Sequence, residues 1–148
     1  MTVLDRPHVV IVGAGCGCLY AVRALKGAEV RTTVIDRHNY HLFQPLLYQV
    51  VTATLSSNNI AYPIRAIARR QTNTHVIMAE VVAIEPSEHN VRLRDGEIGY
   101  DYLIRAADAT HSYFGHFEWE PHAPGLKGIE DALEIRRRIL GESNGGIA

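Results

Sequence analysis

A glycine-rich segment near the start of the chain could bind a phosphate group through its backbone. The segment reads Gly13-Ala14-Gly15-Cys16-Gly17-Cys18 and follows the apolar run at residues 9–12. Gly13 permits a tight turn after a strand, and Gly15 lets the backbone approach a pyrophosphate closely. A helix beginning here would direct its free N–H groups and the positive end of its dipole at the same anion. These residue types in this order predict a phosphate-binding turn.

A carboxylate stands at the position where it could bind a ribose. A second β-branched run, residues 30–35, ends at Asp36, about 20 residues after the glycine segment. Its carboxylate could accept a hydrogen bond from a ribose 2′-OH, which favours FAD or NAD over NADP. Strand, glycine loop, helix and acid together predict a dinucleotide-binding βαβ unit, and a plain βαβ turn without a ligand remains the alternative.

Cys18 departs from this pattern, because it occupies the position of the third glycine. Close helix–strand packing normally leaves no room for a side chain there, and overpacking costs about 1–3 kcal/mol. We therefore expect Cys18→Gly to stabilise the chain. A redox or metal role for Cys16 and Cys18 is the less favoured alternative, because this spacing does not suit a structural disulfide.

Composition excludes several classes of protein. The 148 residues are enough for one domain with a core, and 47% are apolar and 21% charged. The net charge of −1 gives no indication of a nucleic-acid surface. No apolar run approaches the roughly 18 residues of a membrane span, and no secretory signal is recognisable at the start. The two cysteines, Cys16 and Cys18, are two positions apart, a spacing that does not suit a structural disulfide and that fits a reducing cytoplasm.

The rest of the pattern predicts alternating helices and strands. Glu134 and Arg138 are spaced for an ion pair on the last helix, and residues 141–148 are expected to be structureless. Apolar residues on the core side of that helix are Ile129, Ala132, Leu133, Ile135 and Leu140. The helices expected are 16–26, 45–55, 64–70 and 129–140. The strands expected are 30–35, 74–84, 90–94 and 97–107, with a hairpin turn at Asp95-Gly96.

Two further segments carry a family resemblance: residues 36–49, which read DRHNYHLFQPLLYQ, and residues 100–104, which read YDYLI. With the glycine segment, they make the chain resemble the N-terminal part of type II NADH dehydrogenases. These are single-subunit, FAD-containing NADH:quinone oxidoreductases of the pyridine nucleotide-disulfide oxidoreductase superfamily. The resemblance runs from about residue 7 to residue 140 and covers roughly the first third of a complete member.

The resemblance implies a fold and a set of functions. The fold class is α/β: an incomplete FAD-binding Rossmann-like domain at residues 1–140, with a parallel sheet and a small antiparallel meander, and a disordered end at 141–148. It implies FAD as cofactor, NADH as substrate and a quinone near Phe43, Gln44 and Pro45. Membrane association is not encoded in this part. The cofactor-binding residues implied are Gly13, Ala14, Gly15, Gly17, Asp36, Arg37 and Val82.

Two charged residues depart from the family pattern. Arg105 lies within an expected central strand, where burial without a partner would cost several kcal/mol. Asp108 replaces a glycine that meets the cofactor, and a carboxylate about 4 Å from a phosphate is repelled by roughly 4 kcal/mol at an effective dielectric of about 20. We expect weak FAD binding and no NADH oxidation by this chain alone. A non-catalytic adenine-dinucleotide-binding module and a degenerate fragment without cofactor remain alternatives.

Other polar clusters are weaker signals. The spacing of His111, His116 and His122 matches no regular metal site, so we predict none. These three histidines are expected at the surface or at the edge of the core. His38 and His41 flank Tyr40 in the loop that the resemblance places beside the flavin, where a proton relay is the less favoured alternative. The arginines of helix 64–70 are expected to face solvent, with contact to anionic lipid as the alternative; they are Arg65, Arg69 and Arg70.

Overall fold

The computed structural model describes residues 6–107, 109 and 111–143, which form two compact units. The first unit comprises residues up to His41 together with Tyr62 to Asp108, and the second comprises Leu42 to Ala61 together with residues from Ala109 onward. Two short strands, β3 (Tyr40–Leu42) and β4 (Ala61–Pro63), pair where the chain passes between the units. One domain over residues 1–140 stays a prediction, because a compact unit is not by itself an independently folding domain.

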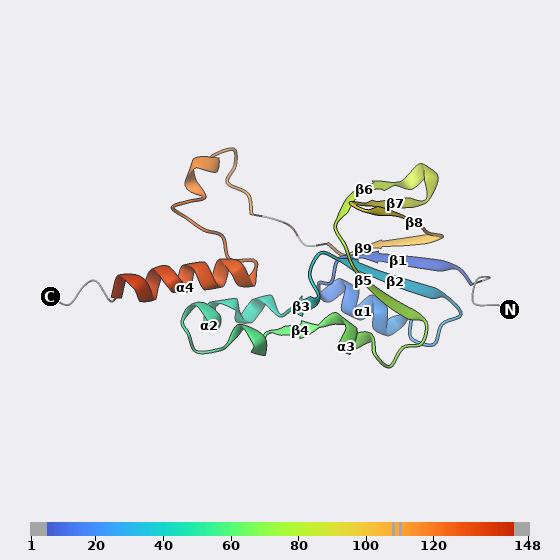
Figure 1. The fold of residues 1–148 in the computed structure, drawn as a ribbon, viewed down its shortest axis with the longest axis horizontal. Helices are drawn as coiled ribbons and strands as arrows, with labels where there is room; N and C mark the ends of the chain where they lie inside the picture. Colours follow the sequence, from blue (N-terminus) through green and yellow to red (C-terminus); the bar gives the residue numbers. More distant parts are fainter. Residues whose placement is uncertain (1–5, 108, 110, 144–148) are drawn as a thin grey trace. The chain divides into compact units, whose positions relative to one another are not determined.

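The first unit is built on a parallel sheet of four strands (Figure 1). Its order is β5-β2-β1-β9, so β1 is paired on both sides and its apolar run is fully buried. The α/β class and the parallel sheet are therefore confirmed. The strands are β1 (His8–Val12), β2 (Arg31–Asp36), β5 (Thr74–Met78) and β9 (Tyr102–Arg105).

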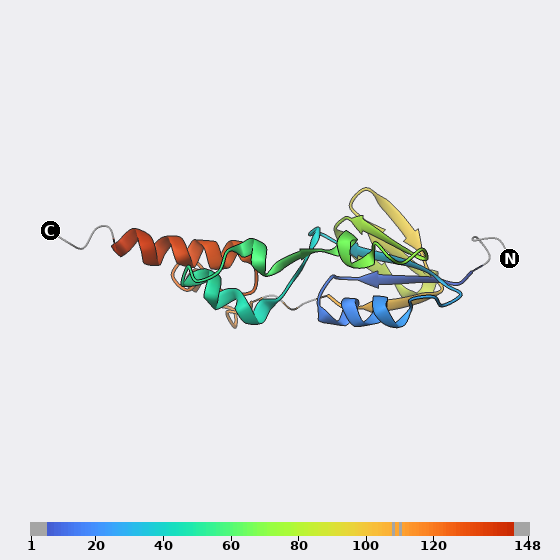
Figure 2. The same ribbon diagram turned by 90° about the horizontal axis from the view of Figure 1, so that it is seen from below.

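Alternate residues of β1 supply the two sides of this sheet. Val9 and Ile11 pack with the helices α1 (Cys16–Ala24) and α3 (Ile64–Ala68). Val10 and Val12 pack on the opposite side, against the antiparallel meander. Figures 1 and 2 show α1 alongside β1 and the meander on the far side of the sheet. The meander strands are β6 (Val81–Glu85), β7 (Asn90–Leu93) and β8 (Gly96–Gly99).

Two expected strands are each divided in the structure. The expected strand 74–84 breaks after β5, because Ala79 N–H donates to the carbonyl of Asp36 (2.9 Å) and the chain then leaves the parallel sheet for the meander. The expected strand 97–107 breaks before β9, where Asp101 N–H donates to the carbonyl of His8 (2.9 Å). In the hairpin, Leu93 pairs with Gly96, so the turn is one residue earlier than expected.

The second unit is helical and packs around a small apolar cluster of Leu47, Val50, Val51, Ile60 and Ala132. The expected helix 45–55 is shorter: a 3-10 turn, Gln44–Leu46, leads into α2 (Leu47–Val51). Ala53, whose φ is +60°, follows just after its end. The expected helix 64–70 likewise ends early, at Ala68.

Helix α4 (Ile129–Ser143) differs from expectation in its length and in its buried face. It continues through Gly141, so residues 141–143 are helical and not structureless, and residues 144–148 lie outside the described part. Ala132 is buried, but Leu133 and Leu140 are 43% and 46% exposed. The expected Glu134–Arg138 ion pair is confirmed at 2.8 Å.

Candidate functional site

The glycine loop begins where β1 ends. Gly13 adopts φ +100°, a conformation that side chains of L-residues rarely accept. Its N–H donates to the carbonyl of Ile35 (2.8 Å), so the turn is fixed beside the carboxyl end of β2. In parallel α/β sheets, this end of the strands is where ligands bind.

The closest backbone approach in the loop occurs at Gly13. A Cβ atom here would lie 2.5 Å from the carbonyl oxygen of Ala106 and 2.7 Å from the Cα of Ala107. Ala106 is fixed in turn, because its N–H donates to the carbonyl of Val12 (2.8 Å). At Gly17 a Cβ would meet only the Ala106 methyl group, at 3.6 Å, which is an ordinary contact. Sterics therefore require glycine at 13 and not at 17.

The amino end of α1 carries no acceptor of its own. Its N-cap is Gly15, which is extended (φ −68°, ψ −174°), and no side chain caps the helix. The first turn contains no acidic residue. The backbone N–H groups of a first helical turn have no intrahelical partner, and together with the helix dipole they favour an anion.

His41 binds the backbone of the glycine loop through its ring. It is 9% exposed, and its Nδ1 lies 2.8 Å from the carbonyl oxygen of Ala14. A carbonyl can only accept, so Nδ1 carries the proton in this contact. The bond joins residues 27 apart in the sequence. No local pattern could have predicted it, because the histidine is brought to the loop by β3 and not by its spacing.

Asp36 stands at the end of β2 with its side chain largely buried. Its Oδ1 accepts a hydrogen bond from the N–H of His38 (2.6 Å), and the His38 ring nitrogen Nδ1 lies 3.9 Å from the same oxygen. Both contacts use Oδ1, so neither of them occupies the other carboxylate oxygen, Oδ2. Arg37 is exposed beside it, and the ring of His38 stacks on Tyr40 at 5.3 Å.

Val82 lies in a bulge at the start of the meander. The neighbouring residues Val81 and Ala83 pair with Leu93 and Arg92, and the register shifts between them. The Val82 side chain is 52% exposed. Val82 therefore lies at the irregularity in the pairing of β6 with β7.

Cys18 is accommodated in the core, contrary to the expected overpacking. It is 4% exposed, and it packs with Val22 and with the sheet residues Val9 and Val34. Burial and the charge of Asp36 raise the pKa of the Cys18 thiol to about 12. A small apolar pocket adjoins it, so there is unfilled space and not excess volume; its lining is Ala14, Cys18, Leu19, Val22, Val34, His41, Ile64, Ile67 and Ala68.

Arg105 is exposed, and the expected burial is wrong. The reason is its position: β9 is an edge strand in the described part of the chain, and Arg105 is its last residue. The last residue of a strand that has a neighbour on one side only can direct its side chain to solvent. Asp108 lies outside the described residues.

The Gln44 turn and the histidine-rich loop belong to the second unit. Phe43 is 47% exposed at the start of this turn. His111 contacts Asp131 (3.2 Å), and His116 contacts Glu118 (2.9 Å). Over residues 6–107, 109 and 111–143, no three histidine, cysteine or acidic residues are grouped to hold a metal ion. In the first unit, the arginines at the end of α3 are solvent-exposed as expected; they are Arg65, Arg69 and Arg70.

Comparison with known proteins gives a consistent result. The family model described as pyridine nucleotide-disulphide oxidoreductase matches residues 7–143. A type II NADH:quinone oxidoreductase of Mycobacterium tuberculosis, NdhA, is 49% identical over 140 residues, covering 92% of this chain and 30% of its own length. An external NADH-ubiquinone oxidoreductase of Saccharomyces cerevisiae is 30% identical over 146 residues, covering 93% and 27%.

The fold agrees with these sequence matches. The structure of NDH2 from Plasmodium falciparum in complex with NADH superposes with a TM-score of 0.86 at 25% identity, covering 97% of this chain and 32% of that one. The chain spans about 30% of the length of the curated relatives it matches. Within the described residues, no helix is both long enough and apolar enough to cross a membrane.

Proposed function

Because the chain belongs to the pyridine nucleotide-disulphide oxidoreductase family, we propose that it is the N-terminal FAD-binding portion of an NADH:quinone oxidoreductase. FAD supplies such a protein with a carrier that accepts a hydride from NADH and releases electrons to a quinone. The chain spans about 30% of its relatives, so the activity is proposed for the complete protein and not for this chain alone. A cytoplasmic location is part of the same proposal.

The observation that carries the proposal is the open amino end of α1 beside Asp36. Gly13 lies so close to Ala106 that no side chain fits, and Gly15 leaves the first turn of α1 without a side-chain cap. A pyrophosphate needs this kind of cradle: close backbone, free N–H groups and a positive dipole end. The residues present therefore fit the phosphate part of FAD.

The other assignments extend from this cradle. Gly13, Ala14, Gly15 and Gly17 would hold the pyrophosphate through their backbone. Asp36 would accept a hydrogen bond from the adenosine ribose, for which its Oδ2 is not engaged by His38. Arg37 would lie beside the ribose, and the backbone of Val82, at the register shift in the meander, would contact the adenine.

The acceptor side of the proposal concerns the second unit. The exposed turn with Phe43, Gln44 and Pro45 would contact the quinone. An aromatic ring and an amide on one turn suit a quinone, because its flat ring packs on apolar surface and its two carbonyl oxygens accept hydrogen bonds. This assignment is made only for the complete protein.

Titration of FAD into the purified chain, followed by quenching of flavin fluorescence, tests the binding site. We expect saturable but weak binding, and at least a tenfold weaker affinity for Asp36→Ala, equal to about 1.4 kcal/mol. The matched control is Glu29→Gln, which removes an exposed acid just before the other end of β2. ADP should compete with FAD, whereas FMN, which lacks the adenosine, should not.

Three outcomes are informative. FAD binding that is unaffected by Asp36→Ala, or blocked by FMN and not by ADP, would refute the cradle assignment. Binding as expected, with no NADH oxidation by this chain alone, is the result that the proposal predicts. Flavin-dependent oxidation of NADH by the isolated chain would refute the view that the missing part is needed.

A further inference from the structure

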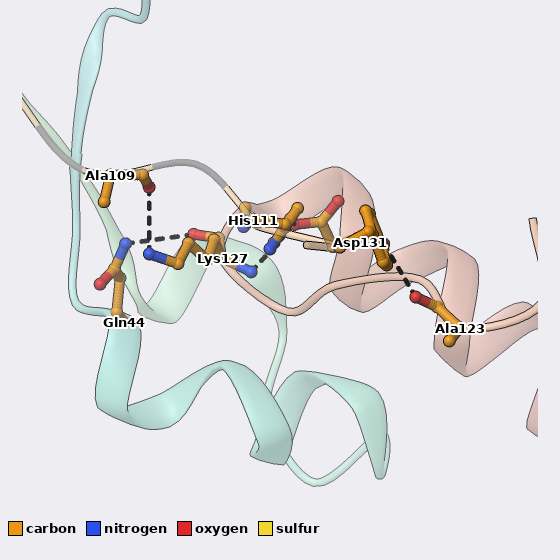
Figure 3. Close-up of polar contacts among 8 residues, drawn as sticks. Gln44, Ala109, His111, Ala123, Lys127 and Asp131 are labelled. Atoms are coloured by element: carbon orange, nitrogen blue, oxygen red, sulfur yellow. Dashed lines mark hydrogen bonds and ion pairs between the residues drawn. The ribbon is translucent and has the colours of Figure 1, made fainter. Parts of the chain in front are cut away.

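The side chain of Gln44 is tied to a loop far away in the sequence. Its Nε2 donates to the carbonyl oxygen of Lys127 at 3.3 Å, a contact between residues 83 apart (Figure 3). The Lys127 ammonium in turn donates to the carbonyl of Ala109 (3.1 Å). We call residues 111–128 the Lys127 loop. The orientation of the Gln44 amide therefore depends on where this loop places the Lys127 carbonyl.

Asp131 fixes that part of the loop. Its Oδ2 accepts hydrogen bonds from the backbone N–H groups of Lys127 (2.9 Å) and Gly128 (2.8 Å). Asp131 is in the first turn of α4, where a carboxylate is also favoured by the helix dipole. One oxygen atom thus holds the peptide groups on both sides of the Lys127 Cα atom.

His111 completes the arrangement from the start of the loop. Its Nε2 lies 3.2 Å from the same Oδ2 of Asp131, as drawn in Figure 3. The ring also lies against the backbone of Gly125, where a Cβ would come within 2.1 Å of the ring atoms Cε1 and Nδ1. The imidazole is held by packing on one side and by the carboxylate on the other.

We propose that Asp131 is a positioning residue for Gln44, acting through the backbone of Lys127. The significance of Gln44 rests on the proposed function, in which its turn contacts the quinone. The positioning itself rests only on contacts within the second unit. In that function, Asp131 would hold the side-chain amide of Gln44 at a fixed angle, so that the amide can donate to a carbonyl oxygen of the quinone.

The charge of Asp131 supports this positioning role. Burial would raise the pKa of Asp131, but hydrogen bonds from Lys127, Gly128 and His111 lower it on balance, so the carboxylate is charged at neutral pH. Hydrogen bonds to a charged acceptor are stronger than those to a neutral one, so the N–H groups of Lys127 and Gly128 are held firmly.

Nuclear magnetic resonance of the full chain tests this directly. The side-chain amide signals of Gln44 are compared in the parent chain, in Asp131→Asn and in Glu130→Gln. We expect these signals to move in Asp131→Asn, because the charge that fixes the Lys127 backbone is lost. Glu130→Gln is the matched control, because it removes the neighbouring charge and should leave the signals in place.

A second variant keeps the test decisive if Asp131→Asn fails to fold. Asp131→Glu keeps the charge but displaces the carboxylate by one methylene group, and it should also move the Gln44 signals. Gln44 signals that are the same as in the parent, in whichever of the two variants folds, would overturn the positioning role.

The same spectra separate this inference from the proposed function. Menadione, a soluble quinone, is added to the parent chain, and the backbone amide signals of Phe43 and Gln44 are followed. Signals that do not move would count against the quinone assignment, whereas the comparison of the Asp131 variants involves no quinone and no FAD. Failure of one experiment therefore leaves the other interpretable.

Discussion

The glycine loop of the first unit and the Lys127 loop of the second are each held by a side chain from elsewhere in the sequence, but under different conditions. His41, which holds the glycine loop at Ala14, is 9% exposed, and the side chain of Asp131, which holds the Lys127 loop, is 30% exposed. A buried hydrogen bond is costly to break, because its partner is left without water. The contact that holds the glycine loop is thus shielded from water, whereas the contact that holds the Lys127 loop is open to solvent.

The comparison extends to how each unit is stabilised. The first unit has apolar clusters on both sides of its sheet, one under the helices and one under the meander. The second has one smaller cluster, and large apolar side chains remain on its surface, including Phe114 at 88% and Phe117 at 74%. Substitutions in the first unit should therefore act mainly through packing and those in the second mainly through polar contacts.

The largest effect is expected for Gly13→Ala. The new Cβ would sit 2.5 Å from the carbonyl of Ala106 in a residue with φ +100°, so strain of about 1–2 kcal/mol adds to overpacking of about 1–3 kcal/mol. Urea unfolding should show a loss of about 3 kcal/mol. Gly27→Ala is the control, because φ is +75° there with nothing within 4 Å. Equal losses in both variants would mean that Ala106 moves away without cost.

Cys18→Gly should destabilise the chain by about 2 kcal/mol, since it removes a buried side chain beside unfilled space and places glycine within a helix. This reverses the expectation from the sequence. Cys16→Gly, at an exposed position at the start of α1, should cost less. Thiol titration at pH 8 should find Cys16 reactive and Cys18 protected until the chain unfolds, because the pKa of Cys18 is raised to about 12. A stabilised Cys18→Gly variant would restore the overpacking view.

A smaller effect is expected from acid on the first unit. Burial and the nearby charge of Arg31 lower the pKa of His8, against the hydrogen bond that its ring makes to the backbone of Gly99 and the charge of Asp101. The folded chain then binds fewer protons at this site than the unfolded chain, so stability should fall as the pH drops below about 6.5. Unfolding midpoints between pH 8 and pH 5 should show this decline in the parent.

The matched variants for that measurement are His8→Gln and His75→Gln. His8→Gln keeps a polar group near Thr33, whose hydroxyl lies 2.8 Å from the His8 ring, and should flatten the pH dependence. His75→Gln, at an exposed position on β5, should not. Asp131 of the second unit does not contribute in this range, because a lowered carboxylate pKa withdraws stability only below about pH 3.8. An unchanged slope in His8→Gln would remove His8 as the cause.

The smallest effect is expected for Glu134→Gln on α4. Glu134 bonds to Arg137 and Arg138 (2.9 and 2.8 Å), and hydrogen bonds to these two arginines lower its pKa to about 2. The pair is open to solvent, with 35% of the Glu134 side chain exposed, and such pairs contribute little because water and salt screen them. The thermal unfolding midpoint should change by no more than the error of the measurement. A clear drop would show that polar contacts on the surface stabilise the second unit more than we infer.

The sequence predicted best where structure follows from local repetition. The strand at residues 8–12, the loop at Gly13 and the helix from Cys16 were predictable, because apolar runs and glycines determine them locally. The break after Met78 and the exposure of Arg105 were not, since both depend on which strands lie next to each other in the sheet. A continuous β-branched run does not reveal that its two halves belong to different sheets.

The candidate site divides in the same way. Gly13 and Asp36 could be named from spacing, because a strand, a turn and a helix of standard length place them near each other. His41 and Asp131 could not, because each acts across a distance in sequence that no pattern specifies. Burial of Cys18 without strain was also not predictable, since free volume beside a residue depends on the helix packed opposite it.

The close approach of Ala106 to Gly13 has a consequence for the order in which the site forms during synthesis. Ala106 is about 90 residues downstream of the strand whose last carbonyl it binds. At about 5–20 residues per second, synthesis of that interval takes on the order of 5 to 20 s. During this time the glycine loop exists on the ribosome with one side uncovered. The loop made first is therefore completed last, and a ligand could be enclosed while the chain is still growing.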